Sequence, residues 1–168
     1  MNVLSQVDYP SIFLGLVLAM GLGVILGLER NIAGKLAGMR TYALVCMGSA
    51  LYIDISRLVL DTAIAGAVID PLRVASQIVV GIGFIGAGLV VLKGGHLTGV
   101  TTAAGIWVSA GVGMACGFEL YALAIFATGL TIFVFTIMWI IERDLIQIWK
   151  KKGEGKCEKI CEEVEKED

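Results

Sequence analysis

The side chains best suited to chemistry in this 168-residue chain are a few charged groups at the borders of long apolar runs. Asp54, Asp61 and Asp70 could together hold a hydrated divalent cation, because Mg²⁺ prefers a few carboxylates and keeps several of its waters. Arg57 follows Asp54 at i+3, so the alternative is a structural ion pair with the other two acids solvated. The sequence leaves both a magnesium site and an ion pair open.

A second polar group borders other apolar runs. It offers either helix caps and positively charged membrane anchors, or a polar gate or anionic-lipid site beneath a helix bundle. Thr101 and Thr102 stand where a helix should begin, so we expect them to cap it. The members of this group are Glu29, Arg30, Lys35, Arg40, Thr41, Thr101 and Thr102.

Residues for enzymatic catalysis are nearly absent. The one histidine, His96, has no serine and aspartate arranged around it in the pattern of a catalytic triad. Cys46 and Cys116 lie in apolar runs and are interpreted as small buried side chains. Cys157 and Cys161 lie one helical turn apart, but two thiols without further ligands do not form a zinc site. The sequence predicts a protein that is not an enzyme, with no cofactor except a candidate magnesium ion.

The elements that position these residues are transmembrane helices. Of the residues, 57% are hydrophobic and 17% are charged, and the mean hydropathy is +0.86. Uncharged apolar runs of about 18 residues predict membrane spans. We therefore predict an all-α polytopic membrane bundle of five helices, with spans at Ile12–Leu28, Thr41–Leu60, Val74–Leu92, Val100–Cys116 and Leu120–Ile141. The second span contains Asp54 and Arg57, and we keep it because the chain would lose its asymmetry of Lys and Arg without it.

The distribution of Lys and Arg predicts the orientation. With five spans, eleven of these residues fall on one side and two on the other. Cytoplasmic loops carry the excess of positive charge. We expect the N-terminus outside and the C-terminus inside, which puts Asp54, Asp70, Arg73 and Gln77 outside and the Glu29 group inside. A net charge of −2 argues against a nucleic-acid partner.

Small residues recur at every fourth position in two predicted spans. Such stripes let helix backbones approach closely in lipid. We expect the two stripes to pack against each other or to form a homodimer seam, and we expect the glycines of the third span to favour close packing too. The residues concerned are Gly15, Ala19, Gly23 and Gly27; Thr101, Gly105, Ser109, Gly113 and Gly117; and Gly81, Gly83, Gly86 and Gly88.

The run GIGFIG in the third span formally matches a nucleotide-binding motif. We reject that interpretation because the motif requires a preceding strand and a following helix. After a membrane domain at residues 1–149, residues 150–168 form a short charged tail. Within this tail Cys157, Ile160, Cys161 and Val164 make one apolar helical stripe.

Three segments of the chain closely resemble the N-terminal membrane domain of the MgtC/SapB family. The match covers about Leu14 to Leu130. The segments are GLERNIAGKLAGMRTYALVCMGSALY, DPLRVASQIVVGIGFIGAGLV and LTGVTTAAGIWVSAGVGMACG. The family-motif residues include the inner group from Glu29 to Thr102 and, on the outer side, Asp70, Arg73 and Gln77.

The resemblance implies a five-span protein of the inner (plasma) membrane with a role in magnesium homeostasis, especially adaptation to scarce magnesium. Virulence-associated members of the family are regarded as regulators of other membrane machinery, and they carry a folded cytoplasmic domain after the spans. Only 27 residues follow Ile141, too few for that domain.

Two functions stay open from the sequence. The first is a non-enzymatic regulator that contacts the lipid bilayer, a second copy of itself in a homodimer, or another membrane protein. The second is a magnesium transporter or channel that uses the outer acids. A transport path needs polar groups near the bilayer midplane, and the spans offer mainly glycine, serine and apolar residues there. This favours the regulator.

Overall fold

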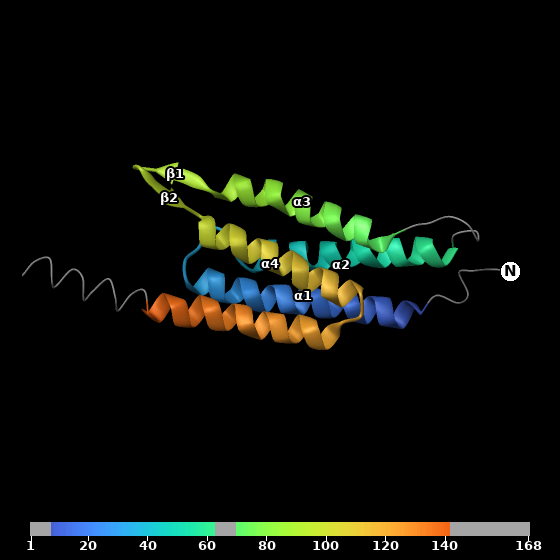
Figure 1. Cartoon of the computed structure of the whole chain (residues 1–168). Coiled ribbons are helices and arrows are strands. Elements are labelled where there is room, and N and C mark those ends of the chain that lie inside the picture. The colour runs from blue at the N-terminus through green and yellow to red at the C-terminus, as the bar shows by residue number, and fades with distance from the viewer. Residues whose placement is uncertain (1–7, 63–69, 142–168) are drawn as a thin grey trace, which may run out of the picture. The chain divides into compact units, whose positions relative to one another are not determined.

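The computed structural model describes residues 8–62 and 70–141, apart from the side chains of residues 61 and 62. Within these residues, five helices are long and apolar enough to cross a membrane (Figure 1). This confirms the all-α membrane fold and the five spans. The helices are α1 (Tyr9–Ile32), α2 (Met39–Thr62), α3 (Pro71–Leu89), α4 (Val100–Gly117) and a fifth helix, Tyr121–Ile141.

A β-hairpin replaces the loop predicted between the third and fourth spans. The third span was predicted to reach Leu92, but α3 ends at Leu89, and strands β1 (Val91–Lys93) and β2 (His96–Thr98) pair antiparallel. The two turn residues, Gly94 and Gly95, both have positive φ, 59° and 81°. A two-residue loop of this kind matches the twist of a hairpin and requires glycine or asparagine, so the Gly-Gly pair could have predicted it.

Helix α2 lies between α1 and α4 and receives the small residues of both. A Cβ atom added to Gly23 of α1 would lie 2.7 Å from the Tyr42 carbonyl oxygen of α2. One added to Gly117 of α4 would lie 2.7 Å from the Ala50 carbonyl oxygen, and one added to Gly113 would collide with the Cys46 carbonyl oxygen. The two predicted stripes therefore face α2, chiefly, rather than each other.

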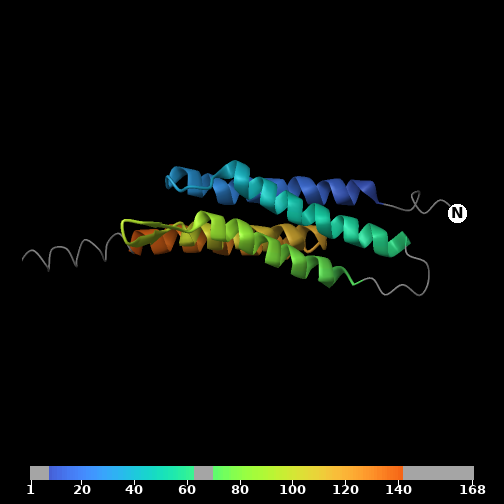
Figure 2. The same ribbon diagram turned by 90° about the horizontal axis from the view of Figure 1, so that it is seen from above.

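The same close approach holds at the ends of the α1 stripe. Gly27 meets the backbone of Met39 at the start of α2, and Gly15 lies near the Cys116 carbonyl oxygen of α4. Figure 2 shows α2 running obliquely across α1. Glycine contacts of this kind are how helices associate in lipid, where burial of apolar side chains between helices gives little driving force.

Helix α3 is the least buried of the labelled helices. Ile82 is its one buried residue among those described. A Cβ added to Gly86 would reach Ala103 of α4 at 3.7 Å, but a Cβ added to Gly81, Gly83 or Gly88 would meet nothing within 4 Å. No atom of the described chain packs closely on these three glycines, so their close packing stays a prediction.

The chain divides into two compact units, Met1–Ile132 and Phe133–Asp168. The first contains α1 to α4, the hairpin and the start of the fifth helix. In the second, residues 133–141 are described and are helical. The predicted boundary after residue 149 and the apolar stripe of the tail lie outside the described residues.

Candidate functional site

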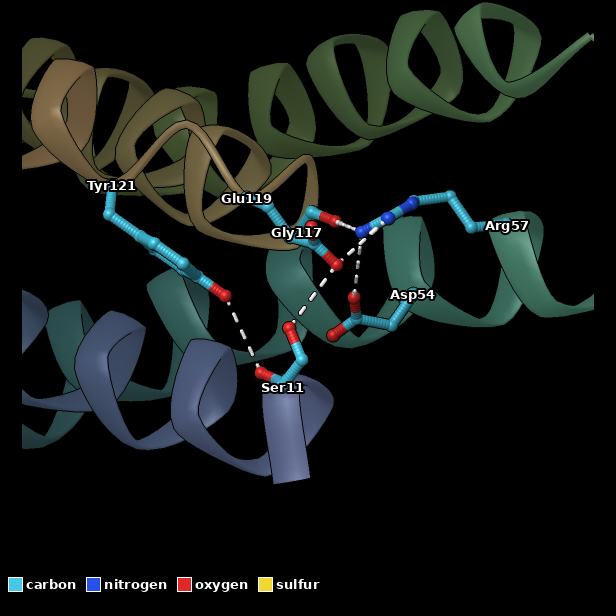
Figure 3. A network of polar contacts seen from close by, with 6 residues as sticks. All are labelled: Ser11, Asp54, Arg57, Gly117, Glu119 and Tyr121. Carbon is cyan, nitrogen blue, oxygen red and sulfur yellow. Dashed lines mark hydrogen bonds and ion pairs between the residues drawn. The ribbon is translucent and has the colours of Figure 1, made fainter. Parts of the chain in front are cut away.

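A polar network joins four helices at the end of the first unit where α1 begins and α2 and α4 end (Figure 3). Arg57 of α2 is its centre. The other contributors are the start of α1, the end of α4, the turn that follows α4 and the start of the fifth helix. The residues of this network, named here the Arg57 network, are Ser11, Asp54, Arg57, Gly117, Glu119 and Tyr121.

Arg57 bridges α2 to the end of α4. Its Nη1 donates to the Gly117 carbonyl oxygen at 2.7 Å, and its Nη2 donates to Glu119 Oε1 at 2.9 Å. The last carbonyls of a helix lack partners within the helix and carry partial negative charge, so a cation is stabilising there. Arg57 thus gives a hydrogen-bond partner to a carbonyl at the C-terminus of α4 and, with the same guanidinium, forms an ion pair with Glu119.

The start of α1 joins through Glu119. Ser11 Oγ donates to Glu119 Oε1 at 3.3 Å, and the Tyr121 hydroxyl donates to the Ser11 carbonyl oxygen at 3.4 Å. Glu119 holds a positive φ of 61°, which is uncommon for a residue other than glycine. Its side chain is therefore presented to Arg57 and Ser11 by a specific turn rather than by a regular helix.

Asp54 is the most buried acid of the network. Its side chain is 4% exposed, and its Oδ1 lies 4.0 Å from Arg57 Nη1. In Figure 3 the other oxygen, Oδ2, points away from Arg57, and it has no hydrogen-bond partner among the described residues. The Asp54–Arg57 pair predicted from the spacing is confirmed, but one arginine is shared between two acids.

The charges of this network do not balance. Two carboxylates, Asp54 and Glu119, face one guanidinium, Arg57. A buried polar atom without a partner is costly, and an ionised one more so. The arrangement can therefore accept a proton or a small cation at Asp54 Oδ2.

The three acids of the predicted magnesium site are placed differently by the structure. Asp70 caps α3, with its Oδ1 accepting from the Leu72 backbone N–H at 2.9 Å. The side chain of Asp61 lies outside the described set. Among the side chains that are described, no three of His, Cys, Asp or Glu gather as a metal site would require. A site formed by Asp54, Asp61 and Asp70 stays a prediction.

Of the outer family-motif residues, Arg73 is exposed on the first turn of α3, and Gln77 lies one turn further along. Gln77 lines an open cavity of about 580 Å³ between α2 and α3. Neither residue belongs to the Arg57 network. Since both lie in α3 at i and i+4, they share one face of that helix.

A second polar layer lies at the other end, where α1 ends and α2 and α4 begin. Glu29 pairs with Arg30, whose side chain is 3% exposed. The Tyr42 hydroxyl donates to the Thr102 carbonyl oxygen at 3.3 Å, and Ser109 Oγ donates to the Tyr42 carbonyl oxygen at 3.1 Å. The first bond ties α2 to α4 at the layer that the sequence placed inside, and the second ties the same two helices about two turns deeper along α4.

The predicted caps of α4 are wrong. The residue at its N-terminus is Gly99, with φ of 89° and no side-chain cap, and Thr102 is buried while Thr101 is exposed. The hairpin supplies the reason, because the chain turns sharply from β2 into α4 and Gly99 approaches the Leu89 carbonyl oxygen too closely for any side chain. Lys35 and Arg40 are exposed and Thr41 is half-buried, as membrane anchors would be.

Between the two layers the described core of α1, α2 and α4 is apolar or weakly polar. Its ionisable carboxylates and guanidiniums, Asp54 and Arg30, belong to the layers themselves. The buried side chains in between are Ala19, Leu22, Leu26, Cys46, Ser49, Ala50, Ile53, Ile106, Ser109, Ala110, Val112 and Cys116.

Sequence reasoning missed Ser11, Glu119 and Tyr121. Each is an isolated polar residue at the end of an apolar run, where solvation is the ordinary outcome. The orientation derived from Lys and Arg places Glu119 on the same side of the membrane as Arg57, so an ion pair between them could have been suggested from the sequence. Neither the carbonyl of Gly117 nor the positive φ of Glu119 is visible in the sequence.

Comparisons with known proteins identify relatives over most of the chain. A family model described as the MgtC family matches residues 16–144. The chain is 42% identical to the protein named "Putative magnesium transporter YhiD" of Escherichia coli K12 over 123 residues, 71% of this chain and 56% of that protein. It is 40% identical to Protein MgtC of Brucella abortus strain 2308 over 127 residues, 76% of this chain and 49% of that protein.

Protein MgtC of Salmonella typhimurium strain LT2 is 42% identical over 115 residues, 68% of this chain and 47% of that protein. The chain thus spans about half the length of the curated relatives it matches. No solved structure matches the chain.

Proposed function

The chain belongs to the MgtC family, a family of multi-pass cell-membrane proteins, and on this premise we propose that it is a non-enzymatic regulator in magnesium homeostasis. It acts in adaptation to low magnesium through helix contacts with a second copy of itself or with another membrane protein. Magnesium enters the proposal through the family and through the name of the relative from Escherichia coli.

The main support for a regulatory function is the outward, apolar face of α3. Val80 is 68% exposed and Phe84 is 84% exposed, and Gly83 between them would have open space around an added Cβ. A glycine beside protruding apolar side chains is suited to receive another helix in lipid. The corresponding small residues of α1 and α4 are already used against α2.

The composition of the core also supports regulation over transport. Transporters and channels place polar or ionisable groups along a route near the bilayer midplane. The described core between the two polar layers contributes Ser49 and Ser109 and is otherwise apolar or thiol-bearing. The distribution of Lys and Arg supports an orientation with the Arg57 network outside and the Glu29 layer inside.

Cross-linking tests the α3 face. Val80→Cys is placed in a chain without other cysteines and oxidised in native membranes, and we expect a disulfide-linked dimer or a cross-link to another membrane protein. Gly83→Leu should abolish the product, because its side chain keeps the partner backbone away. Gly21→Leu on α1 is the matched control, since its added Cβ also meets nothing within 4 Å. Equal cross-linking of Gly83→Leu and Gly21→Leu would contradict the proposal.

A magnesium transporter is the second candidate, and the unpaired Oδ2 of Asp54 favours it. If this oxygen contributes to a cation site, Mg²⁺ should raise the melting temperature of the wild-type protein in detergent and leave that of Asp54→Asn unchanged. Asp8→Asn, outside the network, is the control and should respond as wild type does. Flux of Mg²⁺ into liposomes holding the purified protein separates the two functions: the transporter requires flux, and the regulator requires none.

A further inference from the structure

An apolar groove runs between α2 and α3. Its volume is about 580 Å³. Val80 and Phe84, on the outward face of α3, do not line it. Gly48 of α2 and Gly81 of α3 both line it, and an added Cβ at either would meet nothing within 4 Å. The groove exists because two glycines stand where larger side chains would fill the space.

The length of the groove fits one leaflet of a bilayer. On α3 it extends from Val74 to Ile85, which is about 16 Å at a rise of about 1.5 Å per residue. Half of a hydrocarbon core of roughly 30 Å is about 15 Å. A membrane-spanning helix of a second copy would run along the whole core, so a groove of this length matches the chain of a lipid better.

The polar groups of the groove gather at one end. Gln77 and Tyr52 lie at the end nearest the start of α3, and the lining further along α3, at Ile78, Gly81 and Ile85, is apolar. Arg73 stands one turn before Gln77 and is exposed. Within the part of the chain that the structure describes, no carboxylate lies within ion-pair distance of its guanidinium.

A guanidinium suits phosphate because it donates in a planar fork. The positive end of the α3 dipole adds to the same field, since Arg73 is on the first turn of that helix. The groove thus has a positive charge at one end and an apolar trough as long as one leaflet, which complement the phosphate and the acyl chain of a phospholipid. We propose that the α2–α3 groove binds one membrane phospholipid, with an acyl chain between Gly48 and Gly81 and its phosphate on Arg73 and Gln77.

The proposal is tested by native mass spectrometry of the purified chain with added phosphatidylglycerol, and in parallel with diacylglycerol of the same chains. We expect one phosphatidylglycerol per chain and about ten-fold weaker binding of diacylglycerol, the worth of a charge-assisted hydrogen bond. Arg73→Gln should reduce phosphatidylglycerol binding to the diacylglycerol level. Unchanged binding in Arg73→Gln would overturn the placement of the phosphate.

Gly81→Leu fills the groove and should lower occupancy at least ten-fold. Gly21→Leu is the matched control: it adds the same side chain on α1, outside both the groove lining and the α3 face, and should bind lipid as wild type does. Both positions are open and both changes raise helix propensity, so neither should prevent folding. Equal lipid binding by the two variants would overturn the proposal. So would a wild-type dimer without lipid that Gly81→Leu dissociates, because a second copy would then occupy the groove.

Discussion

The contact of Gly113 with α2 allows a sharp test of the packing, because the same helix offers a matched control. Replacing Gly113 by alanine would drive a methyl group into the carbonyl oxygen of Cys46. The obstacle is a helix backbone, which cannot rotate away as a side chain can, so α2 and α4 must separate. At Gly111, two residues earlier in α4, an added Cβ would meet nothing within 4 Å.

The two substitutions should therefore differ in sign. Overpacking costs about 1–3 kcal/mol or more, and the change from glycine to alanine returns about 1 kcal/mol of helix propensity. Because the added Cβ would collide with a backbone oxygen, the cost should be about 3 kcal/mol, and we expect Gly113→Ala to lose roughly 2 kcal/mol of stability in net, a fall of about 4–8 °C in melting temperature for a chain of this size. Gly111→Ala should gain up to about 1 kcal/mol.

The buried thiols of Cys46 and Cys116 supply the assay. With Cys157 and Cys161 replaced by serine in every variant, a thiol-reactive coumarin maleimide reports unfolding in detergent as the two buried thiols become accessible. The melting temperature should rank Gly111→Ala at or above wild type and Gly113→Ala clearly below it. If both alanine variants melt together, the close approach of α4 to α2 does not limit stability and the reasoning is refuted.

Three further predictions use the same assay. Arg57→Gln should destabilise by about 1–2 kcal/mol, less than a fully buried pair because Arg57 is partly exposed, and adding Asp54→Asn should restore much of the loss; a double variant no better than the single one would show that the two charges do not interact. Ser109→Ala should cost about 1 kcal/mol by removing the bond to the Tyr42 carbonyl, whereas an unchanged melting temperature would mean that this bond has no net worth. Asp70→Ala should cost about 1 kcal/mol through loss of the α3 cap, and Asp70→Asn, which keeps a capping oxygen, should not.

The spans were predictable because lipid imposes a length and a composition on every helix that crosses it. The stripes containing Gly23 and Gly113 were predictable for a similar reason, since close helix packing in lipid needs small residues. Their partner was not predictable. The periodicity of a stripe shows which face of its own helix is small, but not which neighbour that face meets, and α2 carries no regular stripe of its own.

The candidate site was predicted in part. The spacing of Asp54 and Arg57 on one helix is local and therefore visible in the sequence. The contact of Arg57 with Glu119 joins residues 62 positions apart and depends on how α4 ends. The hairpin was missed because a hydropathy window extends an apolar run through Val91 and Leu92, while the turn chemistry of Gly94 and Gly95 decides the local structure.

The central place of α2 has a consequence for the order in which the protein is assembled during synthesis. The α1–α2 interface joins segments that are neighbours in the sequence and can form as soon as both have entered the bilayer, because short-range contacts need little loop closure. Helix α4 then meets a partner that is already in place, and its glycines pack against the side of α2 that α1 leaves open. Helix α3 enters the bilayer between these two events. Because Ile82 is its one described buried residue, its packing constrains neither the α1–α2 nor the α2–α4 interface strongly.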